Sequence, residues 1–112
     1  MVINNAQLDQ VFGALSDATR RGMLAQLAQG ETNITNLAAP YKISQPAISK
    51  HIRVLEQAGL IKRTRQGREY IIRANPAPAE QARDWIAYYA QFWHEQMDAV
   101  EAYLKQTGEL NE

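Results

Sequence analysis

Residues 44–61 have the sequence SQPAISKHIRVLEQAGLI, and this stretch gives the clearest structural signal in the chain. The hydroxyl of Ser44 can accept a hydrogen bond from the backbone N–H of Ala47, and Pro46 is tolerated in the first turn of a helix. A glycine near the end of the stretch suits the end of a helix. Apolar residues recur three or four positions apart, as on the buried side of a helix: Ile48, Ile52, Leu55 and Ala58. The stretch therefore predicts a helix over about 44–58 with one buried and one polar side.

The polar side of this helix carries side chains that suit contact with DNA. An amide, a small apolar group, a hydroxyl and two cations lie off the buried stripe: Gln45, Ala47, Ser49, Lys50 and Arg53. Glutamine can pair bidentately with adenine, alanine can meet the methyl group of thymine, and lysine or arginine can bind guanine or phosphate. Because a helix fits the major groove of DNA, this pattern predicts a recognition helix.

Shorter helical patterns precede this helix. Apolar residues at helical spacing indicate helices around 8–15 and 23–28, and a short third segment over 34–39 that Thr32 or Asn33 can cap. A tight turn then leads into the polar-sided helix. A short helix, a turn and a polar-sided helix in succession predict a helix-turn-helix.

A β-hairpin and a long helix are expected after the helix-turn-helix. Over residues 60–73 the pattern changes to a period of two around Gly67, which predicts a hairpin that would form a wing. A proline-rich break follows, and a long helix is expected over about 79–106. The predicted fold is mainly α with a small β-hairpin: a winged helix-turn-helix with long N- and C-terminal dimerisation helices. Residues 1–112 are predicted to form a single domain.

The charge distribution favours a polyanionic partner. The chain has 12 basic and 12 acidic residues, but residues 42–73 hold eight of the basic and two of the acidic ones, a net charge of +6. Residues 1–41 carry a net charge of −1 and residues 74–112 a net charge of −5. A basic middle third is typical of a segment that binds nucleic acid. Taken alone, the charge is equally compatible with a solvated basic face that has no partner.

Composition and length exclude several classes of protein. A chain of 112 residues suits one domain, and without cysteine it has no disulfides, thiolate zinc ligands or catalytic thiol. The N-terminus lacks the pattern of a secretory signal, and no apolar run is long enough to span a bilayer, so a cytoplasmic location is expected. Nothing supports an enzyme, because no glycine-rich phosphate loop or recognisable pair of carboxylates is present. No cofactor is expected.

Two segments resemble the ArsR/SmtB-type winged-helix repressors. Residues 44–61 resemble the recognition-helix signature of that family, and residues 12–21, FGALSDATRR, resemble its start, although Ala18 replaces a usual proline. The resemblance covers roughly residues 8–106 and implies a homodimeric transcriptional repressor that binds an inverted repeat and is released by an inducer or a metal. The thiolate pair of the family would fall near residues 37–39, so the chain resembles the subgroup that lacks metal-site cysteines.

The DNA-contacting residues are predicted partly from the residues and partly from the resemblance. The resemblance implies contacts by the recognition helix and by Arg65 and Arg68 of the wing, with Pro46 standing where a polar residue is common. The composition of the wing adds Arg63, and the start of the second helix adds phosphate contacts from Arg20 and Arg21. His51 either packs or touches a phosphate. The predicted DNA-binding set is Arg21, Gln45, Pro46, Ala47, Ser49, Lys50, His51, Arg53, Arg63, Arg65 and Arg68.

The last helix is too broadly apolar to pack on one side only. Its aromatic residues at positions 88, 89, 92 and 93 exceed a single stripe, which predicts a dimer seam with the first helix. A hydrophobic ligand pocket among the same aromatic residues is the alternative. The predicted dimer interface consists of Leu8, Val11, Phe12, Tyr89, Phe92, Trp93, Val100 and Leu104.

Two further readings stay open from the sequence. His94, Asp98 and Glu101 share one side of the last helix and could form a weak metal site, although a solvated polar side is the simpler interpretation. The whole domain could also have lost specific DNA binding and serve as a helical module that docks another protein. The predicted partners are double-stranded DNA and a second copy of the chain, with an unknown small-molecule inducer possible and no membrane.

Overall fold

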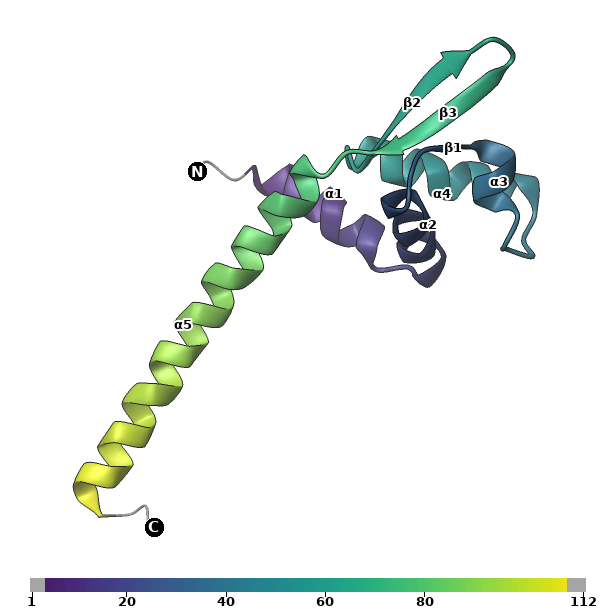
Figure 1. Cartoon of the computed structure of the whole chain (residues 1–112). Helices are drawn as coiled ribbons and strands as arrows, with labels where there is room; N and C mark the ends of the chain where they lie inside the picture. Colours follow the sequence, from purple (N-terminus) through teal and green to yellow (C-terminus); the bar gives the residue numbers. More distant parts are fainter. Residues whose placement is uncertain (1–3, 109–112) are drawn as a thin grey trace. The chain divides into compact units, whose positions relative to one another are not determined.

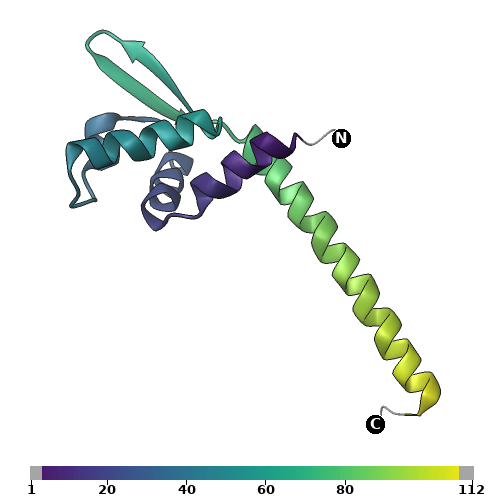
Figure 2. The same cartoon turned by 180° about the vertical axis from the view of Figure 1, so that it is seen from behind.

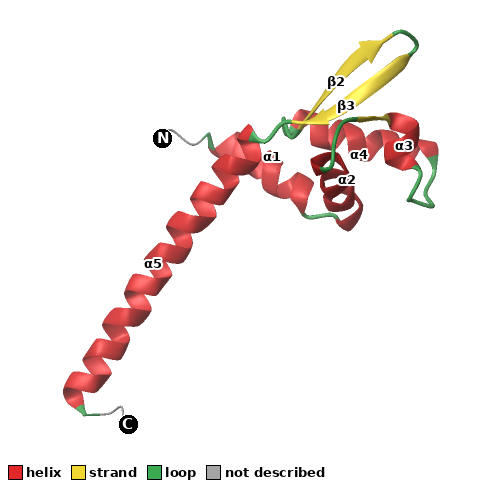
Figure 3. Cartoon of the chain, viewed as in Figure 1, coloured by secondary structure: helices red, strands yellow, loops and turns green. Residues whose placement is uncertain are grey.

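The computed structural model describes residues 4–108 and has five helices and three strands (Figures 1 and 3). In chain order the elements are α1 (Asn5–Leu15), α2 (Ala18–Ala28), β1 (Thr32–Asn33), α3 (Ile34–Ala38), α4 (Gln45–Gln57), β2 (Ile61–Gln66), β3 (Glu69–Ala74) and α5 (Ala77–Thr107). The predicted class, mainly α with a small hairpin, is confirmed. Contacts divide the chain into two compact units, one ending at Ala82 and the other beginning at Arg83.

The helices α1 to α4 each begin at a residue whose side-chain oxygen accepts a hydrogen bond from a backbone N–H three residues later. These residues are Asn4, Asp17, Asn33 and Ser44. The predicted bond from Ala47 to the hydroxyl of Ser44 is present, at 3.2 Å. Such a cap satisfies one of the backbone donors that a helix start leaves unpaired, which fixes where the recognition helix begins.

The sheet has three antiparallel strands in the order β1-β3-β2, one more strand than the sequence predicted. The hairpin pairs Ile61 with Ala74 at its base and Gln66 with Glu69 at its tip. Gly67 in the turn has a φ of 64°, in the left-handed region that favours glycine. The unpredicted strand β1 has two residues and pairs with the middle of β3. A strand this short cannot show a period of two, so sequence periodicity had no means of finding it.

The amide of Asn33 joins the helix-turn-helix to the hairpin. Its Oδ1 accepts a hydrogen bond from the backbone N–H of Asn36 at 2.8 Å and so caps α3. Its Nδ2 donates to Oε1 of Glu69, the first residue of β3, at 3.0 Å. Of the two candidate caps, Thr32 and Asn33, the structure selects the residue that can serve both elements.

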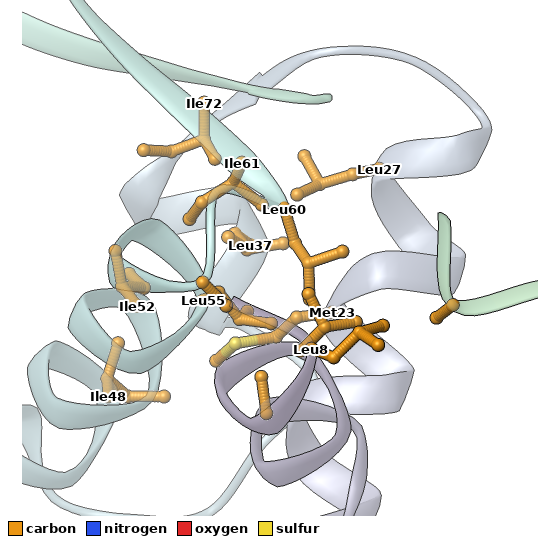
Figure 4. Packing of buried hydrophobic residues seen from close by; sticks show 14 residues of the cluster. Leu8, Met23, Leu27, Leu37, Ile48, Ile52, Leu55, Leu60, Ile61 and Ile72 are labelled. Carbon is orange, nitrogen blue, oxygen red and sulfur yellow. The ribbon is translucent and has the colours of Figure 1, made fainter. Parts of the chain in front are cut away.

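The hydrophobic core lies where α1, α2 and α4 meet the base of the hairpin (Figure 4). The buried stripe predicted for α4 is confirmed, since its four members are at most 2% exposed. Burying a side chain of this size stabilises the fold by roughly 1.5–3 kcal/mol. The core consists of Leu8, Val11, Ala14, Met23, Leu27, Leu37, Ile48, Ile52, Leu55, Ala58, Leu60, Ile61, Ile72 and Ala82.

Leu8 and Val11 correct one expectation from the sequence. Both were predicted to lie in a dimer seam, but they are 6% and 1% exposed and pack inside the first unit. A residue already buried within its own chain has almost no surface left for a second copy to cover. Helical spacing reveals that a side is buried but not which molecule covers it, and this is why the prediction failed.

The helix α5 has 31 residues, close to the predicted 79–106. In its first turns Pro78 and Ala82 are buried, and Ala82 belongs to the core of the first unit. From Arg83 to Gly108 the residues are exposed except Asp84 and Leu104, which are half-buried. Within the described part of the chain, no helix is both long and apolar enough to cross a membrane.

Candidate nucleic-acid interface

The polar side of α4 presents the side chains that the sequence predicted for it. Ala47 is half-buried, whereas the side chains of the other members reach solvent: Gln45, Pro46, Ser49, Lys50 and Arg53 are exposed. Among residues 4–108 the structure gives neither Lys50 nor Arg53 a hydrogen bond or an ion pair within the chain. Both cations are therefore available to an anion or a base outside the protein.

The hairpin of β2 and β3 extends from the body beside α4, and α4 packs against β2 (Figures 1 and 2). Beyond its base the hairpin is exposed, apart from Ile71 and Ile72. A cavity of about 270 Å³ lies between the recognition helix and β2, lined by Ile34, Ser49, Ile52, Arg53 and Arg63. Arg53 of α4 and Arg63 of β2 thus line the same space between the elements predicted to read DNA.

Arg63 is held by a carboxylate of the recognition helix. Its Nη2 donates to Oε1 of Glu56 at 2.8 Å, and its Nε donates to Oε2 of the same residue at 3.3 Å. These hydrogen bonds to the carboxylate raise the pKa of Arg63, and the negative charge of Glu56 adds to the effect. The prediction of Arg63 as a DNA contact misses this pairing: its guanidinium links α4 to the wing.

Tyr70 is a functional candidate that lies in the predicted hairpin over residues 60–73 but was not among the predicted site residues. It is 41% exposed, and its ring lies 5.2 Å from the guanidinium carbon of Arg63 and 5.8 Å from that of Arg65. Such cation–π contacts orient guanidinium groups. Arg65 also donates from Nε to the carbonyl of Gly67 at 3.1 Å, which directs it toward the tip. In a hairpin whose turn is at Gly67, Arg65 lies opposite Tyr70. The position of the turn in the sequence could therefore have predicted that Tyr70 lies beside an arginine.

His51 lies on the inner side of α4, and this corrects its assignment to the DNA-binding set. Its side chain is 17% exposed, and its Nδ1 lies 3.1 Å from Nη1 of Arg20 and 3.8 Å from Oδ2 of Asp17. His51 and Arg20 therefore contact each other across α2 and α4. The other reading of the sequence, in which His51 packs, describes the observed position.

Asp17 and Arg21 complete the start of α2. The backbone N–H of Arg20 donates to the carboxylate of Asp17, and this bond holds the pKa of Asp17 below its usual range. The charge of His51, when its imidazole is protonated, and the charge of Arg20 lower this pKa further. Arg21 is exposed and donates from Nη1 to the carbonyl of Leu15 at 2.7 Å. Arg21 therefore remains on the surface, where a phosphate can reach it.

A ladder of aromatic rings runs along α5. Trp85 stacks on Tyr89 with centroids 5.5 Å apart, Tyr89 meets Trp93 edge-on at 6.1 Å, and Phe92 meets Trp93 edge-on at 6.3 Å. Tyr89, Phe92 and Trp93 are 47–48% exposed, and Val100 is 51% exposed. An apolar stripe this long on a water-exposed helix indicates a surface that another molecule covers.

The structure shows no metal-binding cluster in the part of the chain that it describes. No group of three histidine, cysteine, aspartate or glutamate side chains between residues 4 and 108 could hold an ion. Glu101, one of the three residues that share a side of α5, instead pairs with Nζ of Lys105 at 2.9 Å.

Comparisons with known proteins show the family and agree with the fold. Residues 17–63 match the family model described as bacterial regulatory protein, arsR family. The chain is similar to the transcriptional repressor SdpR of Bacillus subtilis (strain 168), with 33% identity over 79 residues that cover 70% of this chain and 88% of the relative. It is also similar to the crystal structure of an ArsR family transcriptional regulator, with 33% identity, a TM-score of 0.78 and coverage of 84% and 97% of the two chains.

A more distant structure shares the fold. It is the solution structure of a homodimeric winged helix-turn-helix DNA-binding domain from Mycobacterium bovis. The identity is 23% and the TM-score 0.59, and the match covers 84% of each chain.

Proposed function

The chain belongs to the arsR family of bacterial regulatory proteins and is a DNA-binding transcriptional regulator, and from this premise we propose that it is a homodimeric repressor that binds an inverted-repeat operator in the cytoplasm. One observation carries the proposal. The recognition helix exposes an amide, a hydroxyl and two unpaired cations beside an arginine-bearing hairpin. Its relatives are regulators and not enzymes, which agrees with the absence of catalytic motifs from the sequence.

We assign different tasks to the two DNA-reading elements. The exposed face of α4 enters the major groove, where Gln45, Ser49, Lys50 and Arg53 reach base edges and neighbouring phosphates, with Pro46 and Ala47 making apolar contacts. The wing places Arg65 and Arg68 along the backbone or in the minor groove, and Arg21 binds a phosphate. Arg63 supports the wing through Glu56 and His51 supports α4, so neither belongs to the proposed contact set.

The dimer follows from the uncovered stripe on α5. We propose that a second copy covers Tyr89, Phe92, Trp93, Val100 and Leu104, since aromatic side chains at helical spacing commonly pack in cores or dimer seams. The related domain from Mycobacterium bovis is described as homodimeric, which supports this choice. Phe12, which is half-buried, remains the one candidate contribution from α1.

The effector is proposed only by chemical class. The chain has no cysteine, so we place it in the subgroup without the thiolate metal site. We propose a small-molecule inducer as the effector, and the aromatic residues of α5 suit an apolar one. Inducer binding in the dimer seam would release DNA by changing the distance between the two recognition helices.

The decisive experiment selects operators from DNA. Purified full-length protein is offered a library of random duplexes, and the enriched duplex is compared with a random one by fluorescence anisotropy at two salt concentrations with excess competitor. We expect an inverted repeat whose half-sites are about one helical turn apart, and affinity that falls steeply with salt. Failure to enrich any sequence would contradict the proposal and favour the rival module that docks another protein.

A further inference from the structure

The side chain of Arg20 joins three helices. Arg20 lies in α2, but its Nε donates to the carbonyl of Ala14 at 2.8 Å and its Nη2 donates to the carbonyl of Gly13 at 3.1 Å, both in α1. Its Nη1 lies 3.1 Å from Nδ1 of His51 in the recognition helix. The sequence suggested that Arg20 binds a phosphate. In the structure, the guanidinium N–H donors of Arg20 are instead directed to partners within the protein.

The contact with Arg20 defines the state of the imidazole. A guanidinium has donors only, so Nδ1 of His51 accepts this bond only when it carries no proton. The ring is then neutral, with its proton on Nε2. The other charged group that faces the ring is Asp17, the N-cap of α2, at 3.8 Å, and the charged neighbours on α4 itself are Lys50 and Arg53. A proton on Nδ1 would remove the acceptor for Arg20 and give the ring a donor for Asp17.

The position of His51 links this contact to DNA reading. The ring follows Lys50 directly and precedes Arg53 by two residues, and its side chain is only 17% exposed. Because the residues of a helix move as one rigid element over so short a distance, a change at His51 displaces both neighbouring cations. Sub-ångström placement matters for contacts to base edges more than for contacts to phosphates, which tolerate different positions along the backbone.

We propose that Arg20 is a positioning residue that sets the recognition helix through neutral His51, and that protonation of His51 lowers the preference of the protein for its operator over other DNA. This inference rests on the proposed function. The added proton has two opposite effects. Its charge strengthens attraction to any duplex, whereas the loss of the Arg20 bond weakens only the contacts that depend on sequence. The ratio of the affinity for the operator to the affinity for other DNA therefore distinguishes a repositioned recognition helix from the effect of the added charge.

The first experiment follows this ratio with pH. Dissociation constants of the full chain are measured for the duplex enriched from a random library and for a random duplex of equal length, at constant ionic strength, at about pH 7.5 and 5.5, across the range in which imidazoles titrate. For the unmodified protein we expect the ratio to fall about tenfold at the lower pH, the size of one lost base contact. His51→Asn supplies an acceptor that does not titrate, and its ratio is expected to be equal at both pH values.

The second experiment compares two neighbouring arginines at the higher pH. Arg20→Gln and Arg21→Gln each remove one cation from the same turn of α2. We expect Arg20→Gln to lower the operator-to-random ratio about tenfold and to abolish its pH dependence. Arg21→Gln, which loses a proposed phosphate contact, is expected to weaken both affinities by the same factor and leave the ratio unchanged.

Several outcomes would overturn the inference. A pH-independent ratio in the unmodified protein, or an unaltered pH dependence in His51→Asn, would show that the contact does not position α4. Equal effects of Arg20→Gln on both duplexes would assign Arg20 to phosphate binding instead. If circular dichroism shows that Arg20→Gln is unfolded, the His51→Asn comparison decides alone. Failure to enrich any duplex at pH 7.5 refutes the proposed function itself and is distinguishable from all of these.

Discussion

Within the described residues, Arg53 and Lys50 have no hydrogen bond or ion pair, unlike Arg20 and Arg63. Arg63 is bound by the carboxylate of Glu56, and Arg20 donates to two carbonyls and contacts an imidazole, so these guanidinium donors already have partners inside the protein. Side-chain type alone cannot separate these cases, since sequence analysis placed Arg63 and Arg53 in the same set. The free cations are therefore the residues at which single substitutions should be most informative.

Arg53→Ala should lower operator affinity by about 1–3 kcal/mol, or roughly 5- to 150-fold, because a base or phosphate contact is lost. Lys50→Ala should act in the same direction. Neither should change the thermal unfolding temperature much, as both side chains are exposed. Anisotropy and circular dichroism on the same samples test both statements, with Arg83→Ala in α5 as a variant that also removes one arginine. Operator affinity retained in Arg53→Ala would contradict its assignment.

Asp17 makes folding stability depend on acid pH. Its pKa in the folded protein is lowered, chiefly by the hydrogen bond from the Arg20 backbone, so the native state binds protons less readily than the unfolded chain does. This stabilisation is present above the unfolded pKa and is lost as pH falls through the folded one. Asp17→Asn, which can still cap α2, should therefore lose less stability between about pH 5 and pH 2 than the unmodified protein. Parallel acid-unfolding curves in the two proteins would refute the expectation.

At the scale of elements, the wing and the recognition helix should contribute differently to binding. Arg65 is held near the hairpin tip by Gly67 and Tyr70, where backbone phosphates and the minor groove are the accessible parts of DNA. Arg65→Ala should weaken binding to operator and random duplexes by a similar factor. It should also reduce the salt dependence of log Kd by about one contact. A loss confined to the operator would show instead that the wing reads sequence.

The helix α4 was the most predictable element, and the reasons are physical. Its cap, its apolar stripe and its polar side are all local features, and local features can be read from one stretch of sequence. Strand β1 and the Arg20–His51 contact were missed because both depend on partners 31 or more residues away. Leu8 and Val11 were misassigned for a related reason, since periodicity cannot name the covering surface. The roles assigned to the exposed residues remain predictions.

Leu55 tests the packing of this element. It is fully buried where α4 meets the core, with an exposed fraction of 0%. Leu55→Ala should lower the free energy of unfolding by about 2–5 kcal/mol, because the surrounding side chains cannot fully close the resulting cavity. Urea unfolding measures this loss. A change below about 1 kcal/mol would show that the core rearranges around the smaller side chain.

For the whole molecule, the prediction concerns assembly. Phe92→Glu or Trp93→Glu should convert the dimer to monomers, because a carboxylate would be buried in the proposed seam without a partner. Sedimentation velocity reads the outcome directly. Gln91→Glu introduces the same charge on the opposite side of α5 and should leave the dimer intact. Operator affinity should fall together with dimerisation, since each half-site then binds on its own. An unmodified protein that sediments as a monomer would refute the seam.

The amide of Asn33 has a consequence for the shape of DNA that the protein accepts. It caps α3 with its oxygen and holds Glu69 of the wing with its nitrogen, so the helix-turn-helix and the wing share one anchor. Together with the Glu56–Arg63 pair, this anchor fixes the distance between the recognition helix and the wing. Because this distance is fixed, we expect binding to depend on the width of the DNA groove as well as on its base sequence. Duplexes whose groove width departs from that setting should therefore pay a deformation energy, even where every contacted base is correct.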